Sequence, residues 1–146
     1  MSIFASQTQK TIPIPFDAPH TATIHKLSGK DLDAAQYEHM AGVLSGRGRN
    51  WATRFIRLAK DGLATEADAQ KILTDPLVGY DRLTMVQAGL ISWTYQDGDR
   101  MKPVTLDAIH DLDDEALELF ATAILRLTKP ALFQTAAEQE QAVKND

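Results

Sequence analysis

The sequence predicts a mainly α fold of five to six short helices with a small N-terminal β-hairpin. Three observations lead to this prediction. Apolar side chains recur at spacings of three and four along several segments, which is the period of a helix. Ser, Thr and Asp stand before these segments at capping positions, and Gly or Pro follows them. The alternation typical of strands is confined to the start of the chain.

The composition is that of an ordinary globular protein, and the lack of cysteine suits a reducing compartment. The chain has 146 residues, 44% hydrophobic and 24% charged, which suits a single domain with a sizeable core. It has no cysteine, so disulfides, thiolate zinc sites and cysteine nucleophiles are excluded. A formal net charge of −5 argues against a general nucleic-acid coat.

No pattern of a secretion signal or a membrane span is present in the sequence. The start has no charged residues followed by an apolar run, and the longest helical apolar run, residues 119–125, is cut by Arg126. We therefore expect a cytoplasmic location.

The N-terminal hairpin is expected over residues 10–27, within a single helical domain over residues 10–130. Ile12, Ile14 and Phe16 alternate with prolines, so this strand should be an edge strand whose proline side faces out. Residues 1–9 are expected to be a flexible N-terminus. Residues 131–146 have few large apolar side chains and should be weakly ordered or partner-dependent.

Helices are expected at residues 28–45, 51–61, 65–74, 75–93, 106–110 and 112–128. A capping box of Ser28 and Asp31 opens the first of them. Its apolar positions are Leu32, Ala35, Tyr37, Met40, Ala41 and Leu44.

The helix over residues 75–93 is expected to be the centre of the fold. Asp75-Pro76 places a proline in its first turn, where proline is tolerated. The spacing of its large apolar residues predicts a buried helix face made of Leu83, Val86, Leu90 and Trp93.

The sequence offers no pattern of catalytic or metal-binding residues. The four histidines lack the spacing that places two ligands on one helix face. The acidic run at residues 111–115 has no glycine at the position that a calcium loop requires, so helix capping explains it better. A glycine-rich phosphate loop is absent. We expect no cofactor, no metal and no enzymatic activity.

Two candidate binding regions remain. A basic cluster with interleaved Trp51 and Phe55 is either a surface for phosphate or an acidic partner, or a solvated helix face, which is the favoured interpretation; its members are Arg47, Arg49, Arg54, Arg57 and Lys60. Tyr95 is either a partner anchor or part of the core.

Three segments resemble a known family. They are Ile-His-Lys-Leu-Ser-Gly-Lys-Asp-Leu at residues 24–32, Gly-Leu-Ile-Ser-Trp at 89–93 and Leu-Asp-Asp-Glu at 112–115. In this order they resemble the tail assembly chaperones of long-tailed bacteriophages, over roughly residues 10–130.

The resemblance implies a small, mostly helical, non-enzymatic protein of the host cell cytoplasm. Such proteins coat the tape-measure protein, recruit tail-tube subunits and are absent from the finished virion. Many are also made as a longer frameshifted product, which would place the junction after Pro130.

The expected partner-binding residues follow from both lines of reasoning. The edge strand, with Ile12, Ile14 and Phe16, is expected to add to a strand of a neighbouring subunit, giving a homo-oligomer. Tyr95 and the four arginines of the basic cluster are further candidates, and residues 131–146 are expected to order on binding. The alternatives are a virion structural component of the tail or neck, and a small DNA-binding regulator that uses the surface from Arg47 to Lys60.

Overall fold

The fold is an α/β mixture, so the prediction of a mainly α fold is wrong. The computed structural model describes residues 3–45, 59–63 and 65–134. Within these, strands form a three-stranded antiparallel sheet in the order β1-β2-β3 and a two-stranded sheet, β4-β5. Their bounds are β1 Gln9–Pro13, β2 Thr21–His25, β3 Leu90–Trp93, β4 Gln96–Asp97 and β5 Arg100–Met101.

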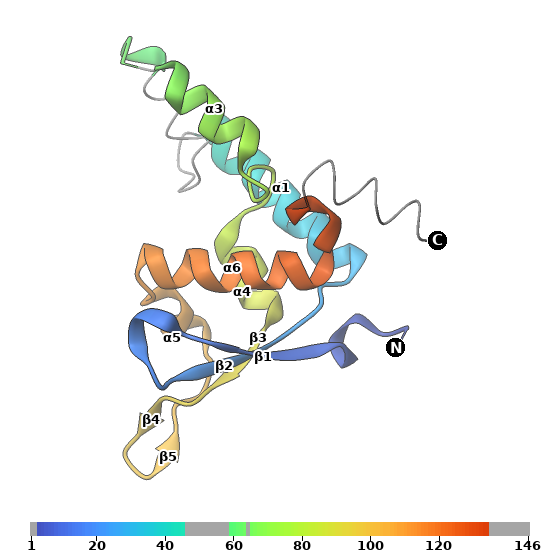
Figure 1. The fold of residues 1–146 in the computed structure, drawn as a ribbon, viewed down its shortest axis with the longest axis vertical. Coiled ribbons are helices and arrows are strands. Elements are labelled where there is room, and N and C mark those ends of the chain that lie inside the picture. Colours follow the sequence, from blue (N-terminus) through green and yellow to red (C-terminus); the bar gives the residue numbers. More distant parts are fainter. Residues whose placement is uncertain (1–2, 46–58, 64, 135–146) are drawn as a thin grey trace.

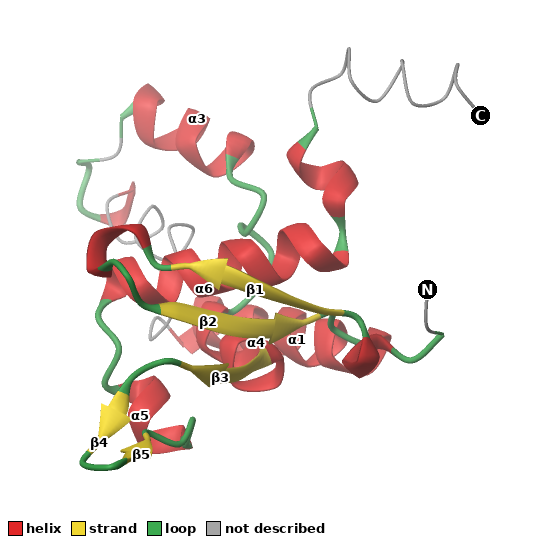
Figure 2. Cartoon of the chain, turned by 60° about the horizontal axis from the view of Figure 1, so that its bottom comes forward, coloured by secondary structure: helices red, strands yellow, loops and turns green. Residues whose placement is uncertain are grey.

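Some of the helices lie against one face of the larger sheet and others extend away from it, as Figures 1 and 2 show. Their bounds are α1 Gly29–Ser45, α3 Glu66–Thr74, α4 Arg82–Gly89, α5 Leu106–His110 and α6 Asp114–Thr128, with 3-10 turns η1 Ala5–Gln7, η2 Pro15–Asp17 and η3 Pro130–Phe133. In Figure 2 the sheet lies in front of α4 and α6. Most of the helix expected over residues 51–61 falls outside the described residues.

The core lies between this sheet and the two helices α4 and α6. The strands present buried apolar side chains to it; these are Ile12, Ala22, Ile24, Leu90 and Trp93, extended by Ile14 just after β1. The helices fill it from the other side with Met85, Val86, Leu117, Phe120, Ala121, Ile124 and Leu125. On the opposite face of the sheet, the hydroxyls of Thr11 and Thr23 lie 3.1 Å apart. The sheet is therefore apolar on one face and polar on the other, as its alternation requires.

The N-terminal hairpin is confirmed, because β1 and β2 pair antiparallel from Gln9↔His25 to Pro13↔Thr21. The amide of Ile14 donates to the carbonyl of His20, and the carbonyl of Thr8 accepts from the amide of Lys26. The backbone N–H and C=O groups of the even-numbered residues in this segment therefore point towards β2. The backbone groups of the odd-numbered residues point away from β2, and on that side Pro13 and Pro15 have no N–H to donate. The edge of the sheet formed by β1 therefore offers fewer hydrogen-bond donors to a further strand.

The prediction of a central helix over residues 75–93 is wrong at both ends, because α4 is shorter on each side. Helix α4 begins only after Asp81, whose carboxylate accepts from the Thr84 amide at 3.0 Å. It ends at Gly89, and Leu90 and Trp93 belong to β3, opposite Ile24 and Ala22 of β2. Pairing with β2 satisfies backbone groups that a longer helix would have satisfied internally. The burial of Leu90 and Trp93 was predicted correctly although the element was not.

The segment before α4 is a turn and not the predicted first turn of a helix. The carboxylate of Asp75 accepts a hydrogen bond from the Leu77 amide at 2.9 Å, which is a turn typical of Asp. Leu77 is then buried in the core. The proline at position 76 lies in this turn and does not open a helix.

Candidate protein-binding site

The residues proposed for strand addition differ in their accessibility. Ile12 and Ile14 lie in the core, with 7% and 1% of their surface exposed, so a partner cannot reach these side chains. Phe16 is 47% exposed at η2 and remains available. The four arginines of the basic cluster, at positions 47, 49, 54 and 57, lie outside the described residues.

Tyr95 is held by contacts within the chain. Its hydroxyl donates to the carboxylate of Asp17 at 2.6 Å, and its ring stacks on His20 with centroids 4.1 Å apart. It also meets the edge of Trp93, and Nδ1 of His20 lies 2.9 Å from Oγ1 of Thr94. Burial, then the hydrogen bond and charge of Asp17, raise the pKa of Tyr95 to about 12. These contacts bind the loop between β1 and β2 to the end of β3, so Tyr95 has a structural role.

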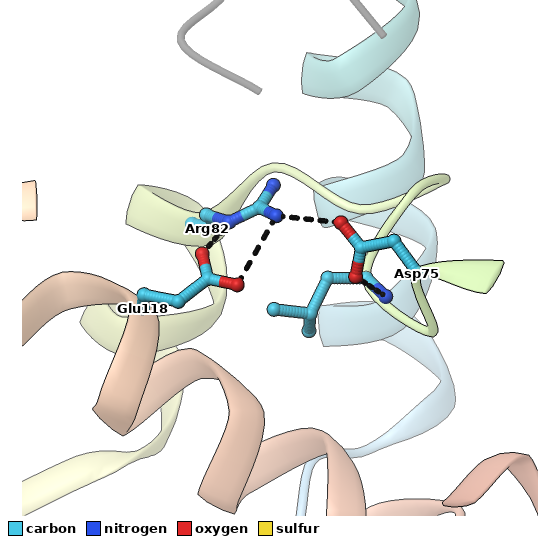
Figure 3. A network of polar contacts seen from close by, with 4 residues as sticks. Asp75, Arg82 and Glu118 are labelled. Atoms are coloured by element: carbon cyan, nitrogen blue, oxygen red, sulfur yellow. Dashed lines mark hydrogen bonds and ion pairs between the residues drawn. The ribbon is translucent and has the colours of Figure 1, made fainter. Parts of the chain in front are cut away.

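Arg82 joins three segments through charged contacts (Figure 3). Its Nη2 atom contacts the carboxylate of Asp75 at 2.9 Å, and its Nε and Nη2 atoms bind Glu118 of α6. Burial alone would lower the pKa of Arg82, but the hydrogen bonds and charges of Glu118 and Asp75 raise it above its ordinary value. The Nη1 atom is buried and has no hydrogen-bond partner. Arg82 is therefore a fixed positive charge that serves the fold.

A groove of about 620 Å³ lies between α1 and α4. Helix α1 lines it with residues from one of its faces and α4 with residues from its first turns; together they are Asp33, Ala34, Tyr37, Glu38, Asp81, Leu83, Thr84 and Gln87. Tyr37 is 72% exposed, and Met40, one turn further along α1, is 56% exposed. The described residues that line the groove include three carboxylates and no lysine or arginine.

The groove was not predicted from the sequence, because helical spacing places Tyr37 and Met40 on the apolar face of their helix. Among the described side chains of α1 only Ala35 is buried, and its carbonyl accepts from the Asp81 amide at 3.0 Å. The small side chain lets the two segments approach at this point. A signal was present in the sequence: Tyr37 and Met40 lie on a different side of the helix from Ala35.

A second hollow, of about 590 Å³, lies beside the N-terminus. The chain around η1 forms one wall and the connection from β2 to α1 forms the other. Ile3 and Phe4, at its rim, are 92% and 61% exposed. Its polar lining groups, including His25, Lys26 and Asp31, are of mixed charge, so it has no electrostatic preference.

No group of three or more His, Asp or Glu side chains in the described part of the chain is placed to hold a metal ion. None of the helices described is long and apolar enough to cross a membrane.

Comparison of the chain with models of protein families, with curated proteins and with solved structures finds no match. The described residues form a small domain of mixed helices and strands with a groove between α1 and α4.

Proposed function

We propose that this chain is a non-enzymatic tail assembly chaperone of a long-tailed bacteriophage. It binds the tape-measure protein in the host cytoplasm, associates with further copies of itself and recruits tail-tube subunits. The basis is the family resemblance of residues 24–32, 89–93 and 112–115.

The observation that supports this proposal is the spatial convergence of the three resembling segments. The first contains part of β2 and the start of α1, and the second ends α4 and forms β3; Ile24 of one lies opposite Leu90 of the other. The third precedes and opens α6, which packs on α4. The three segments that carry the resemblance therefore belong to one structural unit.

A second supporting observation is the exposure of two large apolar side chains on α1. Tyr37 and Met40 are large and exposed on a helix whose described buried side is small. Exposed aromatic and methionine side chains are enriched at protein interfaces. A helix in this position suits a chaperone that covers an elongated helical client.

Co-expression with the tape-measure protein tests the function directly. We expect a soluble complex by size exclusion with light scattering, and an insoluble or degraded client when the chaperone is omitted. A monomer that leaves the client's solubility unchanged would refute the proposal.

The two alternatives make different predictions in other measurements. A virion structural component would be found by mass spectrometry in purified particles, where a chaperone should be absent. A DNA-binding regulator would show salt-sensitive DNA binding that is lost on changing Arg54 and Arg57. The net charge of −5 disfavours this second alternative.

A further inference from the structure

The exposed face of α1 and the groove beside it form one continuous surface. Asp33, Tyr37 and Met40 follow one another at spacings of four and three, so they form a stripe along the helix. Ala34 and Leu83 give the groove apolar walls next to this stripe. Such a surface has the shape and the polarity that receive the apolar face of another helix.

The charged side chains among the described residues that line the groove are all acidic. Asp33 and Glu38 are exposed on the α1 side, and Asp81 lies on the α4 side. Within the described part of the chain, neither Asp33 nor Glu38 takes part in an ion pair or a hydrogen bond of its side chain. Both carboxylates are therefore available to a partner.

The nearest positive groups do not cancel this charge. Arg82 is bound to Asp75 and Glu118, on the side of α4 that meets α6. His39 is electrostatically coupled to Asp81, but burial, with a smaller effect of Arg82, lowers its pKa, so its neutral form is favoured.

We propose that the α1–α4 groove binds an amphipathic helix that carries lysine or arginine beside its apolar residues. Tyr37 packs on the apolar side of this helix, and Asp33 and Glu38 pair with its basic side chains. A neutral helix gains the same apolar contacts but loses the charge pairs, and an acidic helix is in addition repelled by the carboxylates. This inference names the chemistry of the client segment and in that respect rests on the proposed function.

The direct test uses two synthetic amphipathic helices and fluorescence anisotropy. One contains leucine, lysine and arginine, and in the other every basic residue is replaced by glutamate. We expect wild-type protein to bind the basic peptide at least about tenfold more tightly at low salt, with the preference falling as salt rises. Equal affinity for the two peptides would overturn the proposal.

Two pairs of variants separate the charge from the aromatic contact. Asp33→Asn/Glu38→Gln should weaken binding of the basic peptide by about tenfold. The matched control Asp99→Asn/Glu115→Gln removes one Asp and one Glu, both exposed and outside the groove, and should bind as wild type does. Tyr37→Ala should weaken binding by about tenfold, whereas Tyr37→Phe should not.

Circular dichroism of each variant shows whether it has folded, so that lost binding is not confused with lost structure. Unchanged binding by a folded Asp33→Asn/Glu38→Gln protein would refute the groove. A dimer of the protein that Tyr37→Ala dissociates would identify a second copy as the occupant and would also overturn the proposal.

The same variants keep the two proposals apart. If wild-type protein prefers the basic peptide and fails to form a complex with the tape-measure protein, the chaperone function fails and the groove's specificity stands. If the complex forms and Asp33→Asn/Glu38→Gln binds the client as wild type does, the groove proposal alone is lost.

Discussion

The hydroxyl of Thr128, in the last turn of α6, accepts a hydrogen bond at 3.0 Å from the amide of Leu27, which follows β2. The same hydroxyl donates to the carbonyl of Ile124 at 2.8 Å. Thr128 and Leu27 are both buried. This contact joins the end of the last long helix to the link between the sheet and α1.

Thr128→Val should destabilise the protein by about 1–3 kcal/mol, because it leaves the buried Leu27 amide without an acceptor while keeping the side-chain shape. Thr128→Ser keeps the hydroxyl and should lose less. Urea denaturation of both variants measures the difference. Equal stability of the Val and Ser variants would show that the hydrogen bond contributes nothing.

Gly89→Ala should destabilise the fold by about 1–3 kcal/mol through overpacking. A Cβ atom at this position would lie 2.9 Å from two atoms of Ile124, where α4 crosses α6. Gly79→Ala is the matched control, since a Cβ there meets nothing within 4 Å.

Thermal denaturation checks the Gly89 prediction, and a second substitution checks its cause. Gly89→Ala/Ile124→Val removes one of the carbons near the clash and should recover part of the loss. If Gly89→Ala is as stable as wild type, α4 and α6 do not approach as closely as described.

Arg82→Met should cost about 2–3 kcal/mol, because it leaves Asp75 and Glu118 without their cation. The figure is below that for a fully buried pair, since Glu118 is 47% exposed. Arg82→Lys keeps the charge but cannot contact both carboxylates through a planar fork, so an intermediate loss is expected. Arg100→Met, at an exposed position, is the control and should change little in a denaturant titration.

The Tyr95 hydroxyl should ionise late in an alkaline absorbance titration, at about pH 12. The folded state favours the protonated phenol, so the associated stability is present below the ordinary pKa of about 10 and is lost as pH rises through about 12. Tyr95→Phe should remove this late component.

Asp17→Asn provides the test of the cause, because it removes the carboxylate charge next to the Tyr95 phenol. The pKa of Tyr95 should then fall towards its ordinary value, with the part caused by burial remaining. A pKa that does not move would exclude Asp17 as a contributor.

Local signals predicted the helix ends that side chains determine. Thr105 accepts from the Ala108 amide at 3.1 Å, and Asp31 and Ser28 bond reciprocally as a capping box. Lys129 and Pro130 end α6 as expected. These features depend on neighbours in the sequence and are therefore readable from it.

The third strand was not predictable in this way. Val86, Leu90 and Trp93 keep a helical spacing across the junction and are all buried, because a register shift between β2 and β3 lets both Leu90 and Trp93 reach the core. The element changes at Gly89 only because β2, contributed by the start of the chain, supplies pairing partners. Long-range pairing overrides local periodicity here.

The binding surface was missed for a related reason. Tyr37 and Met40 are apolar and lie on a helix, so their spacing alone assigns them to a core. Only the position of α4, which meets α1 at Ala35, shows that these side chains remain exposed. The groove is a product of tertiary packing and has no motif of its own.

Because β2 lies at the centre of the sheet, the sheet can be completed only after a much later part of the chain has been synthesised. Strand β1, which pairs with β2, is synthesised first, whereas β3 is synthesised much later. Helix α6, which packs on β2, is synthesised later still. Contacts so distant in sequence slow folding and leave the early hairpin uncovered while translation continues. A ribosome that stalls before α6 is complete therefore carries an apolar hairpin without its cover, a substrate for the folding and degradation machinery of the cell.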